Sequence, residues 1–543
     1  MGERVSVVFD DFAGGDWGSL LGPDQAPAGT YRGHNVVVYE TGVLGPRPGM
    51  IEMGTLPAGF PGGLAISNPV GGIGVEKPVG LAIAGSGVHR WDLMTGVAGG
   101  AISGSFAASA AGYPAGVWAD VGTAHVYVAR PGDGVYRVDL DAGTLTKLAS
   151  SPMSRVVARV GPLIAAGGDE GQTPNEVYYS TAGDPTEWNP LNFELVGDLS
   201  PVTFLRQMRS TLVAGKKSGW MGIGGLGTAD PYLQVLSDAP GPATGAAVAV
   251  TGTGAVGYMP GDGPPVAAVF DGGVASVQRD RRFPYVAGEN PPVVEERALP
   301  APSASVVRAG RNGLLYSATI LAPSTFGPTE RTAVWLFDGL RWSFHGLSRG
   351  LGHLAAPELH QVYGLDEPFY PHNYVWATGW DIDPSPLYRL RVGDLQRPGY
   401  GMGSQADAVL GASDDPGATS GHHVEFPTVR DPERRMIRPQ NVTLHLERYS
   451  MGPGYGTRYV EVVLLPVGDD QQTDADPGVV VWSFTHRDDG VGTEEGSVRV
   501  VRSIDAGPFG TWPASGYRVR LALHGFGLRA VEVEHEVLAG RRP

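Results

Sequence analysis

Short apolar stretches that turn back on themselves recur between residues 56 and 395. The clearest example runs from Thr332 to Trp342, where alternating apolar residues flank Asp338-Gly339. Asp-Gly between two such stretches is a strong signal for a β-hairpin with a tight turn. Related units occupy Val88–Gly96, Val135–Gly143 and Ala267–Gly273, and a looser one occupies Leu387–Asp394. The pattern predicts antiparallel hairpins repeated along this region.

The spacing of these hairpins narrows the choice of fold. Asp92 and Asp139 follow equivalent strands and lie 47 residues apart, which is about the length of a four-stranded propeller blade. We therefore predict a β-propeller at residues 56–395, preceded by an extended segment and hairpin at residues 1–55. The longer step from Asp271 to Asp338 makes the repeat irregular. Hairpins of another all-β fold remain the alternative.

The pattern changes in the last part of the chain. Residues 396–423 are polar and Gly-rich and predict a linker. Beyond them the strands are longer, with strict alternation of apolar and charged residues, which predicts sheets packed on one side and wet on the other. The expected strands are Val442–Glu447, Tyr459–Leu465, Val479–Phe484, Ser497–Val501, Tyr517–His524 and Ala530–Val537. These six strands predict a C-terminal β-sandwich at residues 424–543.

The composition fits an all-β chain and excludes some functions. Among 543 residues there are 82 Gly and 45 Pro, yet 42% of the residues are apolar, so folded cores are expected. The chain has no Cys, which excludes disulfides and thiolate chemistry. The formal charge of −16 argues against a general nucleic-acid-binding surface. No secretory leader is evident, and no run approaches the ~20 apolar residues of a spanning helix, so no stable membrane insertion is expected.

The N-terminal region carries a distinctive set of short motifs. Pro23-Asp24-Gln25-Ala26 precedes a strand that begins at Asn35-Val36, and residues 42–49 read Gly-Val-Leu-Gly-Pro-Arg-Pro-Gly. This set of motifs resembles the opening stretch of bacteriophage tail proteins with a β-propeller core. Such proteins have Gln-Ala before a strand beginning Asn-Val, and then Gly-x-Leu-x-x-Arg-Pro-Gly. Asp24 stands where the family usually has Gly, and the loop before Asn35 carries additional Pro and Gly.

Two further stretches resemble the same family. Asn175–Trp188 contains a strand with Tyr-Ser and then Gly-Asp-Pro-Thr-x-Trp. We expect Asp184-Pro185 to open a turn and Trp188 to pack back onto the blade. Val202–Gly224 reads as another hairpin of this kind. The matching motifs together extend from Val5 to Trp342.

The resemblance implies a structural component of a virion tail. The expected place is the nozzle or hub of the distal tail, as a homo-oligomeric ring around the DNA channel, with a hexamer as the first expectation. Other tail proteins such as the adaptor and the fibres would be neighbours, and DNA would pass an acidic wall without specific binding.

A carbohydrate-binding or carbohydrate-cleaving propeller used in host recognition is the alternative. Tyr370, Tyr374, Trp376 and Trp380 form an aromatic cluster that could stack on sugars. Packing of these rings inside a blade is the simpler interpretation. A cleft with paired carboxylates of raised pKa would favour the enzyme, whereas broad contacts between subunits would favour the tail protein.

Two glycine-containing stretches are reminiscent of nucleotide sites. Gly252–Gly257 spells the dinucleotide fingerprint, but Pro260 and Pro264-Pro265 follow where that fingerprint requires a helix. Ala214–Ser218 is similar to the end of a phosphate loop, but Ser210 stands where the first Gly of that motif is needed. Neither stretch predicts a cofactor.

Two other stretches carry possible metal ligands. His422, His423 and Glu425 are close in sequence, but no third ligand is evident on the strand face that His423 and Glu425 would share, so a solvated strand edge is expected. Asp469–Asp476 is acidic but lacks the ligand spacing and central Gly of a calcium loop. The sequence therefore predicts no catalytic, cofactor-binding or metal-binding residue, and no enzyme activity.

Overall fold

The structure is a computed structural model in which every described element is a β-strand. It describes residues 3–12, 15–16, 29–34, 36–39, 41–46, 50–59, 61–67, 79–93, 96–107, 117–121, 125–169, 173–243, 247–250, 255–258, 266–271, 274–279, 305–310, 313–319, 332–337, 342–347, 351–355, 374–379, 384–391, 423–448, 458–467, 482–488, 496–504 and 514–538. Within these residues no helix is long and apolar enough to span a membrane. The predicted all-β class is confirmed.

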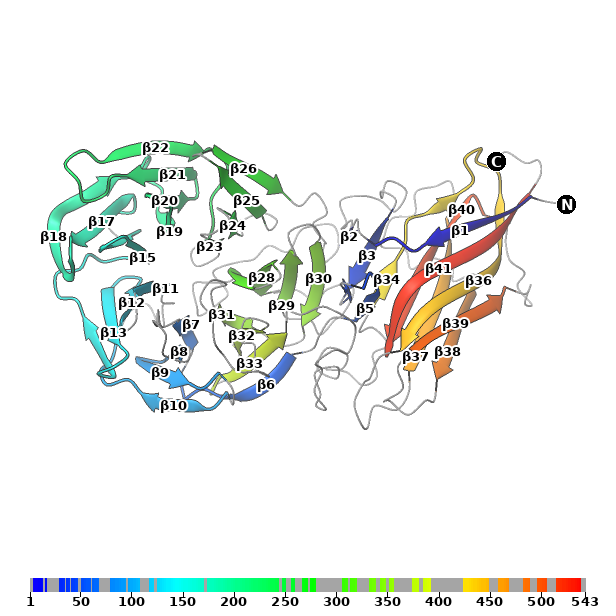
Figure 1. The fold of residues 1–543 in the computed structure, drawn as a ribbon, viewed down its shortest axis with the longest axis horizontal. Helices are drawn as coiled ribbons and strands as arrows, with labels where there is room; N and C mark the ends of the chain where they lie inside the picture. The colour runs from blue at the N-terminus through cyan, green and yellow to red at the C-terminus, as the bar shows by residue number, and fades with distance from the viewer. Residues whose placement is uncertain are drawn as a thin grey trace.

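Seven four-stranded antiparallel sheets of the described residues are arranged around a common axis as the blades of a propeller (Figure 1). The first four blades consist of β7 (Pro61–Ser67), β8 (Val79–Ala84), β9 (Gly87–Trp91) and β10 (Ala98–Ala101); β11 (Val117–Val121), β12 (His125–Arg130), β13 (Gly134–Asp139) and β14 (Thr144–Lys147); β15 (Val156–Val160), β16 (Leu163–Gly167), β17 (Glu176–Thr181) and β18 (Asp184–Leu195); and β19 (Val202–Met208), β20 (Thr211–Lys216), β21 (Gly219–Gly224) and β22 (Tyr232–Ser237). The predicted β-propeller is confirmed.

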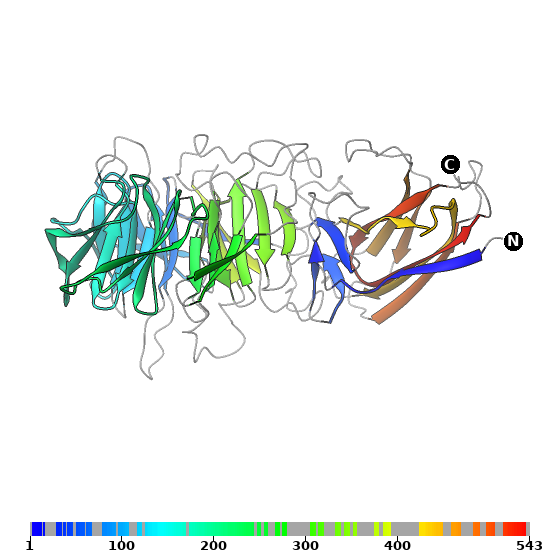
Figure 2. The same cartoon turned by 90° about the horizontal axis from the view of Figure 1, so that it is seen from above.

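The remaining blades complete the disc, which Figure 2 shows edge-on. They consist of β23 (Ala247–Val250), β24 (Ala255–Tyr258), β25 (Val266–Asp271) and β26 (Val274–Arg279); β27 (Ser305–Gly310), β28 (Gly313–Thr319), β29 (Thr332–Phe337) and β30 (Trp342–Leu347); and β31 (Leu351–Ala355), β32 (Tyr374–Gly379), β33 (Pro386–Arg391) and β6 (Met50–Thr55). The first strand of each blade is the innermost, so these strands contact one another around the axis. Apolar side chains between neighbouring blades form the cores, as where Trp91 packs on Trp376 with ring centroids 4.5 Å apart.

Most of the hairpins expected from the sequence are the third and fourth strands of blades, whereas the one expected within Val202–Gly224 is formed by β20 and β21, the second and third strands of the fourth blade. In the second blade, the turn after β13 is held by Asp139, whose Oδ1 accepts hydrogen bonds from the amides of Asp141 (3.1 Å) and Ala142 (2.8 Å). Gly143 then adopts φ +64°, a left-handed conformation that glycine tolerates. The turn at Asp338-Gly339 lies outside the described residues, although β29 and β30 on either side pair as expected.

The looser unit at Leu387–Asp394 has a structural explanation. Its strand β33 is the third strand of the last blade, and the fourth strand of that blade is β6 from the N-terminal region. Pro386 pairs with Thr55 and Leu390 with Met50, and the amide of Leu56 donates to the carbonyl of Ser385 at 2.8 Å. The chain therefore needs no returning strand after β33, because the ring is closed by a strand made earlier.

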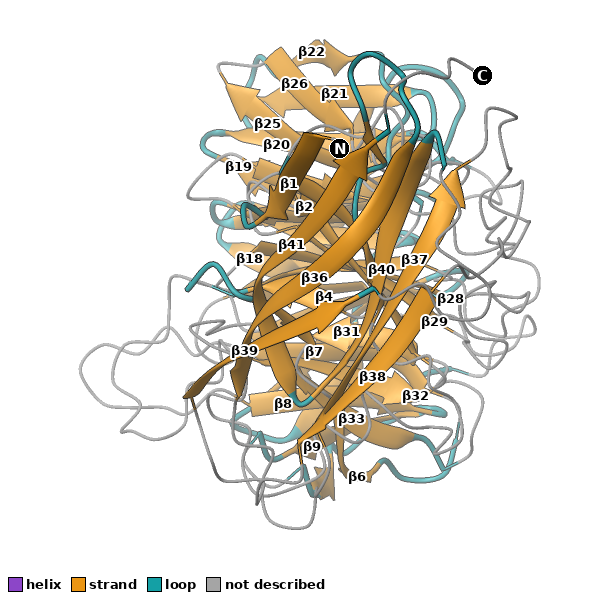
Figure 3. Cartoon of the chain, turned by 90° about the vertical axis from the view of Figure 1, so that its right-hand side faces the viewer, coloured by secondary structure: helices purple, strands orange, loops and turns teal. Residues whose placement is uncertain are grey.

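Beyond the propeller lies a two-sheet domain, seen face-on in Figure 3. One sheet has the order β39 (Gly496–Ser503), β36 (Ile437–Arg448), β41 (Phe526–Val537), β5 (Leu44–Pro46) and β4 (Val36–Val38), with β1 (Glu3–Phe9) also on β41. The other has the order β2 (Gly15–Asp16), β3 (Thr30–His34), β34 (His423–Glu425), β40 (Gly516–His524), β37 (Arg458–Val467) and β38 (Trp482–Asp488), with β35 (Val429–Arg430) on β40. All six strands expected in this region are present as β36 to β41.

The two sheets of this domain share one apolar core. Leu444 and Val533 from the first sheet and Val462 and Leu521 from the second are completely buried in the same cluster. Long strands with alternating apolar residues produce this arrangement because one face of each sheet must be removed from water. The predicted linker lies outside the described residues as far as residue 422, and residue 423 already begins β34.

The N-terminal region, expected as an extended segment and hairpin at residues 1–55, contributes strands to both domains. Strands β1 to β5 pair with strands of the two-sheet domain, while β6 pairs with the propeller. Val36 and Leu44 are buried in the core of the two-sheet domain. The expected hairpin is present, with Gly42 at φ +75° donating to the carbonyl of Tyr39 at 2.9 Å. These short strands form no domain of their own and bury their apolar residues by completing other sheets.

One strand of this region faces both domains. Val36 lies in the core of the two-sheet domain and Val38 packs against it. Val37 and Tyr39, which point to the opposite side, lie in a cluster with propeller residues such as Leu336. Successive residues of a strand face opposite ways, so a four-residue apolar run can serve two cores at once. Residues 36–39 thus form a shared wall between the domains.

Candidate functional site

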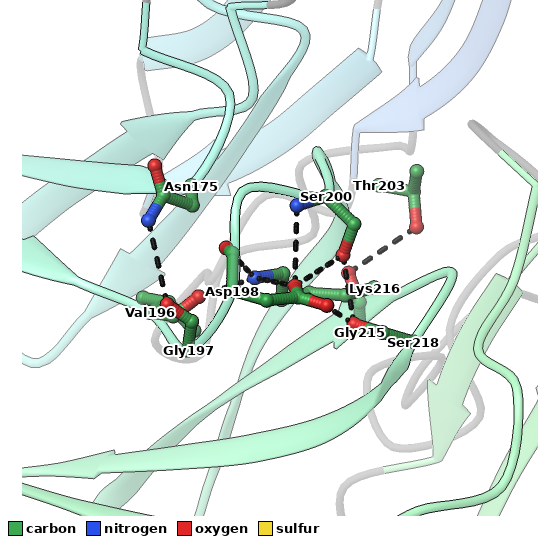
Figure 4. Close-up of polar contacts among 9 residues, drawn as sticks. All are labelled: Asn175, Val196, Gly197, Asp198, Ser200, Thr203, Gly215, Lys216 and Ser218. Carbon is green, nitrogen blue, oxygen red and sulfur yellow. Dashed lines mark hydrogen bonds and ion pairs between the residues drawn. The ribbon is translucent and has the colours of Figure 1, made fainter.

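A buried lysine lies where the third blade leads into the fourth. Lys216, the last residue of β20, is only 1% exposed. Its Nζ donates to the main-chain oxygen of Val196 and to that of Asp198 at 2.5 Å, and lies 2.8 Å from the carboxylate Oδ1 of Asp198 (Figure 4). An ammonium group has three N–H donors. Three oxygens therefore satisfy this buried charge.

Asp198 joins the lysine to a tight turn. Its Oδ1 accepts from the amide and hydroxyl of Ser200 at 3.1 and 2.6 Å, and from the hydroxyl of Ser218 at 3.0 Å. The hydroxyls of Ser200 and Ser218 lie 2.7 Å apart. The bonds from Lys216, and then those from Ser200, lower the pKa of Asp198 far below its usual value. We call Lys216, Asp198, Ser200 and Ser218 the Lys216 cluster.

The surrounding main chain is fixed as well. Asn175 donates to the carbonyl of Gly197 at 3.5 Å, and the hydroxyl of Thr203 reaches the carbonyl of Pro242 at 2.7 Å. Gly168 has φ +82°, and a Cβ there would lie 2.2 Å from the carbonyl oxygen of Val202. Such closeness requires glycine. The connection between the two blades is therefore tied to both of them by polar contacts.

The Lys216 cluster is suited to fixing the conformation of the turn at residues 198–200. A lysine acting as a base or nucleophile needs a free amine, whereas Nζ of Lys216 is surrounded by acceptors. At the tip of the turn, between Asp198 and Ser200, Leu199 is 78% exposed. A side chain presented on a fixed turn loses little conformational freedom on binding. The arrangement can therefore present an apolar anchor to another protein.

Residues resembling nucleotide motifs lie in strands. Gly215 and Lys216 are buried in β20 and cannot form a phosphate-binding loop. After the glycine fingerprint, residues 255–258 form β24, in which Val256 and Tyr258 are buried. Residues 251–254 lie outside the described residues. A strand has no helix N-terminus to receive a pyrophosphate, so the Gly252–Gly257 stretch lacks the required context.

The expected solvated edge at His423 and Glu425 is wrong. These residues lie in β34, which pairs with β3 on one side and β40 on the other. Glu425 is buried and accepts from Arg518 at 2.7 Å and from Arg520 at 2.9 and 3.1 Å. The N-terminal strand β3 makes β34 an internal strand, which the sequence around residue 423 does not reveal. In the described part of the chain no three metal-ligating side chains come together; His422 and Asp469–Asp476 lie outside it.

The aromatic cluster of the carbohydrate alternative is only partly described. Trp376 is completely buried between blades and packs on Trp91, so it is unavailable for stacking on a sugar. Tyr374 begins β32, and Tyr370 and Trp380 lie outside the described residues. Trp188 of the Gly-Asp-Pro-Thr-x-Trp turn is buried in its blade, as the sequence predicts.

The Lys216 cluster was not singled out as a site by the sequence. Two signals point to it in retrospect. Only four residues of the chain are Lys, so a Lys at the end of an apolar strand is unusual. Asp198-Leu199-Ser200 repeats the pattern of Asp184-Pro185-Thr186, where the Thr186 amide and hydroxyl also bond to the Asp184 carboxylate at 2.9 and 2.6 Å. In both places an Asp carboxylate accepts hydrogen bonds from the amide and the hydroxyl of the residue two positions on.

Comparisons with known proteins concern the fold. No protein-family model matches the chain, and no curated protein matches its sequence. The structure is similar to the β-propeller domain of Cps50 (Swd1) of Myceliophteria thermophila, with 12% identity and a TM-score of 0.41 over 63% of this chain and 99% of that one. It is also similar to U3-55K, with 8% identity and a TM-score of 0.41 over 63% of this chain and 98% of that one. At such identities the likeness carries no functional information.

Proposed function

We propose that this protein is a non-enzymatic structural component of a bacteriophage tail. In this proposal it forms part of the nozzle or hub at the distal tail, as a homo-oligomeric ring around the DNA channel, with a hexamer as the first expectation. Its neighbours are further copies and other tail proteins such as the adaptor and fibres. Its location is the virion.

The observation that carries the proposal is the position of the N-terminal motifs. Val36 and Leu44–Pro46, which belong to the motifs that resemble those of tail proteins, lie in the strands β4 and β5. These strands complete one sheet of the two-sheet domain, and residues 36–39 also pack against the propeller. Residues of these motifs thus connect the two-sheet domain with the propeller, which is a structural role. A subunit that transmits force along a tail needs such a joint.

Two physical features support the proposal. The Lys216 cluster fixes a turn that presents Leu199, and fixed apolar anchors suit protein contacts. The formal charge of −16 suits a wall past which DNA slides, because duplex phosphates are repelled. The carbohydrate alternative is weakened by the burial of Trp376, a described member of its aromatic cluster.

The proposal is tested by looking for the chain in purified particles. Mass spectrometry of virions from the phage that encodes it should find its peptides at a constant ratio to the other tail proteins. The purified protein should turn over no glycan and should not retain duplex DNA at moderate salt. Absence from virions together with robust glycan turnover would replace the proposal with the carbohydrate-active alternative.

A further inference from the structure

The outer strand of the fourth blade is an unusually bare sheet edge. In β22, Tyr232, Leu233, Gln234 and Val235 are all exposed, with Val235 at 67%. Among the described strands β22 pairs only with β21, and β26 of the next blade lies near it without pairing. Successive residues of a strand point to opposite faces. Exposure of four in a row means that both faces of this strand are in water and that its outer edge has no hydrogen-bonded strand partner.

Three other described outer strands carry protection that β22 lacks. β10 has four residues and an irregular register, and β14 ends in Lys147. β18 contains Pro185 and Pro190, two glutamates and register shifts. Short strands, charges, prolines and bulges are the usual means of preventing edge-to-edge pairing. β22 has no charge and no proline, and its register shifts only beside Trp220 and Met221. An edge left this bare is expected to be covered by a partner.

The charged residues around β22 indicate which sign of charge the partner should carry. Residues 160–278, which include most of the third blade and all of the fourth, carry eleven acidic residues and four basic ones, namely Arg206, Arg209, Lys216 and Lys217. Asp230 and Asp238 flank β22 itself. This side of the propeller therefore favours a basic and apolar strand.

The chain itself provides such a strand at its other end. β39, with the sequence Gly-Ser-Val-Arg-Val-Val-Arg-Ser, contains no acidic residue and exposes Arg499, Val501 and Arg502. It pairs with β36 and with no other described strand. Figure 1 shows β39 in the two-sheet domain and β22 on the far side of the propeller, so one copy cannot bring the two together.

We propose that β22 of one copy pairs edge to edge with β39 of the next, so that copies associate head to tail. Main-chain hydrogen bonds supply the pairing, and the match between the basic strand and the acidic side of the propeller determines which two strands pair. Because the joined surfaces differ, the contact is heterologous and generates a ring or an open chain of copies. The inference rests on the proposed role as a subunit of a homo-oligomer and adds the surfaces involved.

Sedimentation velocity of the purified full chain tests this proposal. Val235→Lys places a charge on the β22 edge, and Arg499→Glu places an acid on β39; both side chains already face water. Wild-type protein should associate with rising concentration. Each variant alone should dissociate at least about tenfold more readily. Met153→Lys, at an exposed apolar residue outside both strands, is the matched control and should associate as wild type does.

A mixture of the two variants gives the sharper result. Val235→Lys keeps an intact β39, and Arg499→Glu keeps an intact β22, so the mixture has one functional contact and should stop at dimers. Leu233→Lys should reproduce Val235→Lys if the latter fails to fold by circular dichroism. A wild type that stays monomeric, variants that associate as wild type does, or a mixture without dimers would overturn the inference.

The virion experiment separates this inference from the proposed function. Incorporation of Val235→Lys into particles at the wild-type level would overturn the β22 contact and leave the tail role intact. Absence of the wild type from particles would remove the tail role, while sedimentation would still decide the contact.

Discussion

The propeller and the two-sheet domain use the N-terminal region in different ways. Every blade but the last consists of four consecutive strands, and β6 only closes the ring. Both sheets of the two-sheet domain instead combine β1–β5 with strands after residue 422, so that Arg4 lies 3.3 Å from Glu534. Local pairings close short loops, whereas distant pairings require the whole chain. The difference indicates that the propeller can form blade by blade, but the two-sheet domain needs both chain ends.

The shared wall, residues 36–39, contacts both of these domains. Val36 and Val38 belong to the side of the wall that faces the two-sheet domain, and Val37 and Tyr39 to the side that faces the propeller. A strand buried on both faces cannot move with one domain alone without exposing apolar surface to the other side. The N-terminal region therefore couples the two domains mechanically.

The largest expected effect comes from deleting residues 1–46 while keeping β6. The deletion removes Phe12, Tyr31, Val36 and Leu44 from the core of the two-sheet domain. At about 2 kcal/mol for each buried side chain, the loss rivals the whole stability of a domain. Calorimetry should show loss of the transition of the two-sheet domain and survival of that of the propeller. Val8→Ser, on the exposed side of β1, is the control and should preserve both.

Retention of both transitions by the truncated chain would show that strands β1–β5 are dispensable for the domain. The comparison between the two regions would then fail.

Lys216→Ala should damage the propeller and spare the two-sheet domain. The substitution leaves the carbonyls of Val196 and Asp198 without their donor in a buried place. A buried group that loses its partner costs a few kcal/mol, so we expect destabilisation of the propeller by about 3 kcal/mol. Urea unfolding measures it. Lys217→Ala, at the exposed neighbour, is the control. If the two substitutions lowered the free energy of unfolding equally, the cluster would have no specific structural role.

The smallest expected effect is the pH dependence of the Asp198 contacts. Because the pKa of Asp198 is lowered in the folded protein, its stabilising effect is complete above the unfolded pKa of about 3.9 and is lost as pH falls through the folded pKa. The carboxylate side chain is 58% exposed, so the contribution should stay below about 1 kcal/mol. The difference in unfolding free energy between wild type and Asp198→Asn should therefore shrink from about pH 4 downwards.

Asp184→Asn supplies the matched control for that experiment. Asp184 makes the same bonds to a hydroxyl residue two positions on, and its pKa is also lowered, chiefly by Thr186. No lysine contributes to that shift. A pH dependence equally large at Asp184 would assign the effect to the turn and not to Lys216.

Local patterns were sufficient to predict much of the fold. Asp-Gly turns and alternating apolar residues identified the third and fourth strands of blades, and alternation identified β36–β41. The pairing of the N-terminal strands was missed because β4 and β5 have only three residues each, too few to bury a core by themselves. Their partners lie hundreds of residues away, and periodicity does not encode which strands pair.

The contacts of the Lys216 cluster could not be predicted from the sequence, for a related reason. Asp198 and Lys216 are 18 residues apart and belong to a connection and a strand of the next blade. Their meeting depends on blade packing, which places Val196 and Asp198 over the end of β20. The sequence offered only indirect signals, the rarity of Lys and the Asp-x-Ser pattern. Glu425 was misjudged similarly, because its partners Arg518 and Arg520 come from β40.

Small-angle X-ray scattering of the monomer, separated on a sizing column in line, tests most directly whether the shared wall makes one rigid body of two domains. The wild-type curve should be fitted by a single arrangement of propeller and two-sheet domain. Val37→Ser with Tyr39→Ala should require several arrangements, because it removes the propeller-facing side of the wall. A wild-type curve that can be fitted only by a broad ensemble of domain orientations would contradict the account.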